Sequence, residues 1–167
     1  MAEVIFVDHS PEVIKELEKN LEKALEEIGI TCQGHAMDIL EAGLPRNGGA
    51  KTTEGGAGLK GSIDHKVIAG EKAVYVGTDN DHAIYNEYGT GIYAGGSGYW
   101  VYVPGGGKAG QGKRYSLEKA KQVMAILQEQ GVDAHITQGM RPLHFLKNAM
   151  DNNLREYINI IKKYLKQ

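Results

Sequence analysis

The apolar positions near the start of the chain repeat at helical spacing. They follow one another at alternating steps of three and four, so they share one face of a helix. We expect this helix to run from Pro11 to about Ile28, with Ser10 as its N-cap and Pro11 at the first helical position. Two heptads are too few for an independent coiled coil, so the face is expected to pack on the protein's own core. The repeating positions are Ile14, Leu17, Leu21, Ala24 and Ile28.

Gly29 predicts a break or kink after this helix. From Thr31 to Leu40 the apolar pattern is weaker and reads as a second helix, although a strand is not excluded. Gly43 and Pro45 end that segment. The glycine-rich residues 43–58 cannot pack a core, and we expect them to form a mobile loop.

Two apolar runs follow the glycine-rich stretch. Residues Leu59 to Ile68 and Ala73 to Gly77 read as strands, because Val and Tyr favour a pleated surface. A turn at Gly70 and Glu71 would join them into a β-hairpin.

The stretch TDNDHAIYNEYGTG, residues 78–91, predicts a short helix. Asp79 or Asp81 can cap it, Ile84 and Tyr88 share one of its faces, and Gly89 stands where a helix commonly ends. Further along, Ser116 is the expected N-cap of another amphipathic helix.

The last segment begins at GMRPLHFLKNAM, where Pro142 precedes one long amphipathic helix. Three lysines crowd its end, as the helix dipole favours, and binding of DNA by them is an alternative interpretation. These lysines are Lys162, Lys163 and Lys166.

These elements predict an α+β fold with a single domain over residues 1–167. An antiparallel sheet, with strands at 59–77, 99–103 and near 132–136, is expected to pack against the N- and C-terminal amphipathic helices. A Gly-rich insertion near 92–138 interrupts the domain, and its loop at 104–114 is expected to be mobile.

Composition narrows the classes of function. The chain of 167 residues has 19 basic and 21 acidic residues, so its net charge of −2 offers no overall attraction to DNA or anionic lipid. Cys32 is the single cysteine, which excludes an internal disulfide and a cysteine zinc cluster. With no signal peptide or membrane span in the sequence, we expect a soluble cytosolic product.

Residues 101–124 have the order of parts of a nucleotide-binding P-loop, which is an apolar stretch, a glycine-rich loop and a helical pattern. The spacing of Gly107, Gly112 and Lys113 fits G-x-x-x-x-G-K, which holds phosphates. Arg114, however, replaces the Ser or Thr that binds Mg²⁺ in that motif. With Ser116 as its N-cap, the helix also begins after Lys113, whereas the lysine of a P-loop lies in the first turn of the helix. A small cytosolic nucleotide-dependent or protein-binding module using residues 107–113 is therefore only the alternative function.

The remaining polar clusters indicate no enzyme, cofactor or metal. His82 beside Asp79 and Glu87 could be drawn as an acid–base set, but no Ser or Cys stands near it as a nucleophile. A calcium loop fails because Ala83 and Ile84 occupy ligand and glycine positions.

Four motifs in order resemble a family of tailed-bacteriophage proteins. They are GLKGSI, VYVGT, YNEYGTG and GMRPLHFLKNAM, separated by a variable Gly-rich insertion. The family is that of the neck and tail-completion proteins typified by gene product ten of phage HK-ninety-seven. Ala57 and His144 depart from its usual threonine and second proline. The matching residues are Gly58, Leu59, Ser62, Ile63, Val74 to Thr78, Tyr85 or the neighbouring Ala83, Glu87, Tyr88, Gly89, Thr90, Gly91, Pro142, Phe145, Leu146 and Ala149.

The resemblance implies a structural virion protein rather than an enzyme. Family members form rings at the head–tail junction or complete the tail, so the implied partners are copies of this chain and neighbouring neck, tail-terminator or tail-tube proteins. DNA would be only cargo in the channel, no membrane is involved, and assembly would take place in the host cytoplasm. Tyr99, Trp100 and Tyr102 are candidate interface residues, although YWVYV can equally be a strand that covers the core.

Overall fold

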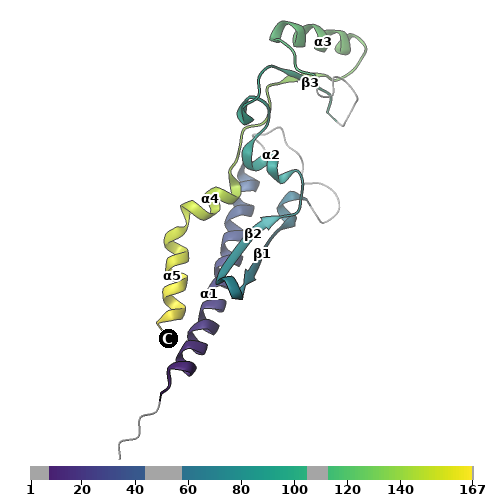
Figure 1. The fold of residues 1–167 in the computed structure, drawn as a ribbon. Coiled ribbons are helices and arrows are strands. Elements are labelled where there is room, and N and C mark those ends of the chain that lie inside the picture. Colours follow the sequence, from purple (N-terminus) through teal and green to yellow (C-terminus); the bar gives the residue numbers. More distant parts are fainter. Residues whose placement is uncertain (1–7, 44–57, 105–112, 167) are drawn as a thin grey trace, which may run out of the picture. The chain divides into compact units, whose positions relative to one another are not determined.

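The computed structural model describes residues 8–43, 58–104 and 113–166 (Figure 1). Residues 44–57 of the loop predicted at 43–58 and residues 105–112 of the loop predicted at 104–114 lie outside the described residues. Contacts divide the described residues into two compact units. The first contains residues 8–41, 58–79 and 145–166, and the second contains residues 42–43, 80–104 and 113–144. That these units act as one domain stays a prediction.

The first unit is built along α1, one continuous helix over Ser10–Gly43. The predicted break at Gly29 is therefore wrong, and residues 31–40 extend the same helix. Gly29 is buried where the hairpin approaches α1, and a Cβ there would lie 2.4 Å from His65 Cδ2 and 2.9 Å from Val74 Cγ2. Glycine is present because two elements need that space, not because the helix ends.

The predicted hairpin is confirmed. Strands β1, Ile63–Ile68, and β2, Ala73–Thr78, pair antiparallel, with Ile63 opposite Thr78 and Ile68 opposite Ala73. A turn of 3₁₀ helix over Ala69–Glu71 joins them. Residues Leu59–Ser62, predicted as strand, form another 3₁₀ turn instead, in which Ser62 Oγ donates to the Leu59 carbonyl at 2.9 Å.

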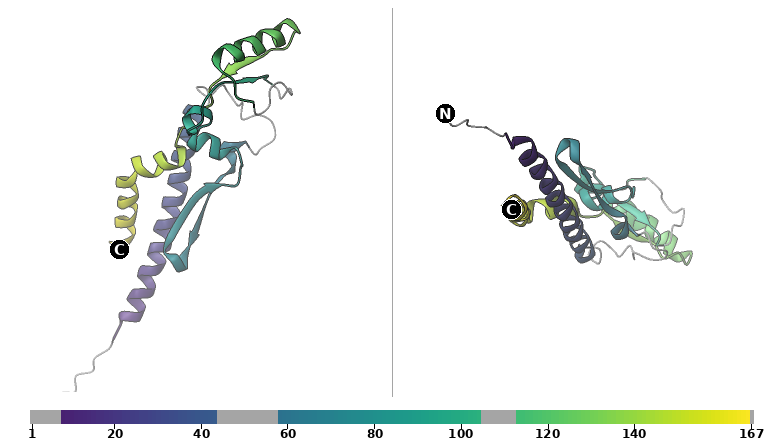
Figure 2. Two further views of the ribbon diagram at one scale, coloured as in Figure 1. Left: turned by 45° about the horizontal axis from the view of Figure 1, so that its top comes forward. Right: turned by 90° about the horizontal axis from the view of Figure 1, so that it is seen from below.

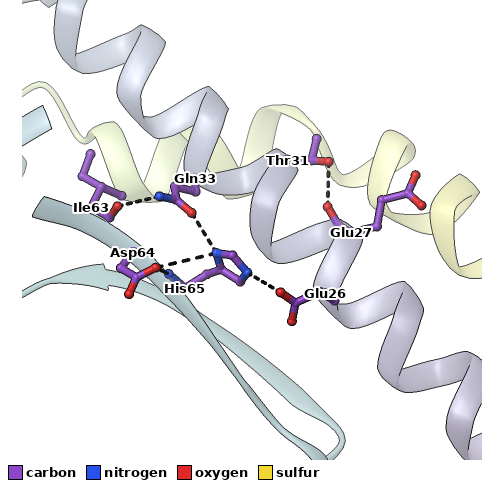
Figure 3. A network of polar contacts seen from close by, with 7 residues as sticks. All are labelled: Glu26, Glu27, Thr31, Gln33, Ile63, Asp64 and His65. Carbon is purple, nitrogen blue, oxygen red and sulfur yellow. Dashed lines mark hydrogen bonds and ion pairs between the residues drawn. The ribbon is translucent and has the colours of Figure 1, made fainter. Parts of the chain in front are cut away.

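Polar contacts fix the hairpin to α1 (Figure 3). His65 Nδ1 lies 2.7 Å from Gln33 Oε1, and His65 Nε2 lies 3.1 Å from Glu26 Oε1. The Gln33 side-chain amide also donates to the Ile63 carbonyl at 2.7 Å. The imidazole is thus held at both nitrogens by side chains of one helix, directly beside Gly29.

The C-terminal segment packs along the other side of α1, so that α1 lies between it and the hairpin (Figure 2). It is not the single helix predicted but two, α4 over Phe145–Asn152 and α5 over Leu154–Leu165. At the break, Asn153 Nδ2 and Tyr157 Oη both donate to the Ala149 carbonyl, at 2.9 and 2.8 Å. Side-chain donors occupy the carbonyl that a helix amide would use, which ends α4.

The core of the first unit comes from all of these elements. Phe145, Leu40 and Ile63 are its largest fully buried side chains, each contributing about 1.5–3 kcal/mol through burial. Its other buried apolar residues are Ala24, Leu25, Ile28, Cys32, Ala36, Leu59, Ala149, Tyr157 and Ile160.

The second unit has its own small sheet. Strands β3, Trp100–Tyr102, and β4, His135–Thr137, pair antiparallel and are separate from β1–β2. The prediction of one sheet packed against the first and last helices is therefore wrong for these strands, because β3 and β4 pack against α3 instead. Helix α3, Leu117–Glu129, begins as predicted, with Ser116 Oγ accepting from the Lys119 amide at 3.3 Å.

The α+β class is confirmed, since helices and antiparallel strands occur in both units. The short helix α2 also lies where it was expected, over Ala83–Tyr88, with Gly89 at its C-cap. Its expected cap is wrong. The N-cap residue is His82 rather than Asp79 or Asp81, and it makes no side-chain capping hydrogen bond; the Asn80 side chain accepts from the His82 amide at 2.9 Å just before the helix.

Candidate interaction surfaces

Two of the four motifs meet in the second unit. Residues 86–92 run beside residues 138–144, and we call this pairing the motif junction. The Asn86 carbonyl accepts from the Leu143 amide at 2.7 Å, and the Glu87 carbonyl accepts from the His144 amide at 3.2 Å. These bonds satisfy carbonyls of the last turn of α2, which a helix end leaves without partners.

The junction continues past the end of α2. The amide of Thr90 donates to the Met140 carbonyl at 2.8 Å, and the Met140 amide donates to Thr90 Oγ1, also at 2.8 Å. One step further, the Ile92 amide donates to the Gln138 carbonyl at 2.9 Å. Thr90 therefore bonds Met140 through both its backbone and its side chain.

Glycine is required on both sides of the junction. Gly89 has φ 76°, Gly91 has φ 65° and Gly139 has φ 116°, a region that favours glycine. A Cβ on Gly91 would lie 2.0 Å from the Gln138 carbonyl oxygen, and one on Gly139 would lie 2.2 Å from that of Thr90. Gly89, Thr90 and Gly91 thus allow the two backbone segments to lie in direct contact, and the carbonyls of Thr90 and Gly91 also accept from the amides of Tyr93 at 3.3 Å and Gly96 at 2.8 Å.

The other motif residues divide between core and surface. Leu59, Ile63 and Phe145 are buried, while Pro142 and Leu146 are partly buried. Ser62 Oγ lies 2.5 Å from Thr78 Oγ1 and so links the first turn to the end of β2. Glu87 is buried in α2, whereas Tyr85 and Tyr88 are exposed beside Ile84.

The alternation of β3 settles which of its side chains cover the core. Val101 is buried with Ala120 and Ala134, and Tyr99 and Val103 pack against this cluster. Trp100 and Tyr102 point to the opposite face, since successive side chains of a strand alternate. The interpretation of YWVYV as a strand that covers the core is therefore confirmed for Tyr99, Val101 and Val103, and the interface role of Trp100 and Tyr102 stays a prediction.

The outer side of this sheet is an aromatic face. Trp100 pairs with Thr137 and Tyr102 with His135 in the strand register, and the rings of Tyr102 and His135 lie 5.5 Å apart. The Arg114 guanidinium lies over the Trp100 ring, 5.9 Å from its centroid, as in a cation–π contact. We define the aromatic face as Trp100, Tyr102, Arg114, His135 and Thr137.

Sequence reasoning missed the role of Arg114, which it considered only as a mismatch to the P-loop. It also missed Arg141, whose Nε donates to Tyr93 Oη at 3.3 Å and whose guanidinium lies 5.7 Å from the Tyr93 ring centroid. The occurrence of Arg together with aromatic residues, both common in interfaces, was the sequence signal that could have identified these two arginines.

The structure places several of the residues that the sequence offered for acid–base, metal and nucleotide chemistry. His82 is exposed and lies 6.2 Å from the Tyr85 ring, while Glu87 is buried. Within the described ranges, no three His, Cys, Asp or Glu side chains are placed to hold a metal ion. Lys113 lies before the N-cap Ser116 rather than inside α3, unlike the P-loop lysine; Gly107 and Gly112 lie outside the described residues.

Comparisons of this chain with protein-family models, curated proteins and solved structures found no match. Among the helices of the described residues, none is both long and apolar enough to cross a membrane.

Proposed function

We propose that the chain is a structural protein of the tailed-phage head–tail junction, where it forms a ring around the DNA passage and joins or completes the tail. The observation that carries this proposal is the ordered set of four family-like motifs. The motif junction supports it, because two of these motifs, YNEYGTG and GMRPLH, are far apart in sequence but are hydrogen bonded to each other through their backbones.

The surfaces support a protein-binding role over catalysis. Large aromatic side chains and Arg dominate the binding energy of interfaces, and the aromatic face presents both kinds on one sheet. The exposed Ile84, Tyr85 and Tyr88 of α2 add further apolar surface. In this proposal the partners are copies of the chain and adjoining neck, tail-terminator or tail-tube proteins. The protein is not an enzyme, and its location is the virion.

Electron microscopy of particles made without this protein tests the proposal. A phage or prophage that encodes the chain should produce filled heads and separate or unfinished tails when its gene is deleted, and supply of the gene in trans should restore joined particles. Complete infectious particles from the deletion strain would contradict the proposal. Binding of Mg·ATP in calorimetry, abolished by Lys113→Ala, would favour the alternative nucleotide-dependent module.

A further inference from the structure

The apolar face of α1 continues beyond the elements that cover it. Ala24, Leu25 and Ile28 are buried, but Val13, Ile14 and Leu17 on the same face are between 45 and 56 % exposed. The register of the two helices explains why. Glu27 of α1 lies beside Lys163 in the last turn of α5, and His35 lies beside Glu156 near its start. The purple start of α1 therefore extends past the yellow end of α5 (Figures 1 and 2).

Helix α5 has a second apolar face. Tyr157 and Ile160 are buried within the first unit, whereas Leu154, Ile158 and Leu165 are between 44 and 47 % exposed. The exposed three are spaced by four and seven residues, so they form a stripe along the outer side of the helix. We call this the α5 stripe, and we call Val13, Ile14 and Leu17 the α1 stripe.

The two stripes carry opposite charge along their edges. In helical projection Glu16 borders the α1 stripe on one side and Glu18 and Glu22 border it on the other, while Arg155, Lys162 and Lys166 border the α5 stripe on its outer side. Glu18 contacts Lys72 at 3.7 Å. The other five form no ion pair with any residue that the structure describes.

We propose that a second copy of this chain covers these surfaces, with the α1 stripe of one copy on the α5 stripe of the next. Two different surfaces meet in such a heterologous contact, so repetition closes a ring or continues a filament. At about 1.5 Å rise per residue, Val13 to Leu17 spans roughly 6 Å and Leu154 to Leu165 roughly 17 Å, so the whole α1 stripe fits within the length of the α5 stripe. As a ring contact, this inference rests on the proposed function.

Single variants and their mixture test the contact. Ile14→Asp disables the α1 stripe and Ile158→Asp disables the α5 stripe, both at exposed positions. In sedimentation experiments up to millimolar concentration at low salt, wild-type protein should form oligomers and each variant should be monomeric. The two variants mixed one to one should form a dimer, because each retains the surface that the other has lost.

The matched control is Ile30→Asp. Ile30 is an isoleucine of α1 with 57 % exposure, but it lies off the stripe, so this variant should associate like wild type. Salt should weaken the contact, because opposite charges line its edges. As a second measurement, chains carrying Leu17→Cys and Ile158→Cys should form a disulfide-linked heterodimer only when mixed; the native Cys32 is buried.

Several outcomes would overturn the proposal: a wild-type chain that is monomeric throughout, variants that associate normally, a mixture without dimers, or duplex DNA bound by the α5 stripe in place of a second copy. The outcome is separable from that of the proposed function. If the deletion strain fails to join heads to tails but both Asp variants enter particles normally, the contact is wrong and the function stands. If the contact forms but the deletion strain makes complete phage, the function is wrong.

Discussion

Gly29 lets the hairpin lie directly against α1, and the absence of a side chain is what makes this possible. The His65 ring occupies the space that a Cβ would need, and its two nitrogens are held by Gln33 and Glu26. A sequence pattern cannot distinguish this use of glycine from a helix end, because both place a residue without Cβ inside an amphipathic repeat.

Gly29→Ala should therefore destabilise the protein although alanine is the better helix former. The helix propensity gain is about 1 kcal/mol, but the new Cβ would force His65 and Val74 to move, at a cost of about 1–3 kcal/mol. Gly34→Ala is the matched control, since a Cβ at Gly34 meets nothing within 4 Å. Thermal melting should show a lower Tm for the first variant and a higher Tm for the second. Equal stabilisation by both would contradict the close approach.

The ion pair between α1 and α5 predicts a pH dependence. Lys163 Nζ lies 2.8 Å from Glu27 Oε2. The hydrogen bond from Lys163 lowers the pKa of the Glu27 carboxyl most, and a hydrogen bond from Tyr164 lowers it further. A carboxyl with a lowered folded pKa contributes stability above its unfolded value of about 4.3, and this contribution is lost as the pH falls through the lowered value.

The Tm difference between wild type and Lys163→Met should thus be present at neutral pH and disappear in acid, as the pH falls through the lowered pKa of Glu27. It should be small, because exposed ion pairs contribute little. Lys162→Met is the control, since Lys162 forms no ion pair with the described residues; its difference from wild type should not depend on Glu27 protonation. A Lys163→Met effect that persists in acid would show that lost packing, not charge, is responsible.

At the scale of elements, the sequence predicted the helix starts and turns that depend on contacts between residues close in the chain. The N-cap at Ser116 and the turn at Gly70 and Glu71 were predictable because each depends on residues close in sequence. The break at Asn153 was not, because it depends on which side chains reach the Ala149 carbonyl. Nor could sequence pair Thr90 with Met140 across the motif junction, since no local pattern encodes that pairing.

Gly91→Ala should weaken the motif junction more than Gly95→Ala. Both glycines have positive φ, 65° and 77°, so both variants incur similar backbone strain of about 1–2 kcal/mol. Only at Gly91 would the Cβ also meet a backbone oxygen, at 2.0 Å, whereas nothing lies within 4 Å at Gly95. We expect Gly91→Ala to cost about 1–3 kcal/mol more in chemical denaturation. Equal losses would mean that the junction adapts without strain.

At the scale of the whole molecule, each unit has its own core and its own exposed surface. The class of fold was predictable from the alternation of helical and strand patterns. The division into two units was not, because it depends on which distant segments bury each other. The candidate interface was predictable in part. The sequence identified Trp100 and Tyr102, but not which face of the strand is buried, because that depends on the packing of Val101 against α3.

Trp100→Ala should hinder incorporation into particles more than it lowers the Tm of the free protein. Trp100 lies on the aromatic face rather than in the cluster around Val101, and loss of an interface tryptophan costs about 2 kcal/mol or more of binding. Ile126→Ala, an exposed residue of α3 in the same unit, is the control and should enter particles normally. A Trp100→Ala protein that melts far lower but still enters particles when folded would place Trp100 in the core.

The motif junction also has a consequence for engineering. Ile92 and Gln138 are hydrogen bonded to each other, so the part of the second unit that carries β3, α3 and β4 begins and ends at one point of the motif junction. The free-energy cost of closing a loop grows only slowly with its length. Residues 93–137 can therefore be replaced as a whole by a segment of different length. A binding peptide or a different small fold could be grafted between residues 92 and 138 without redesign of the base that holds it.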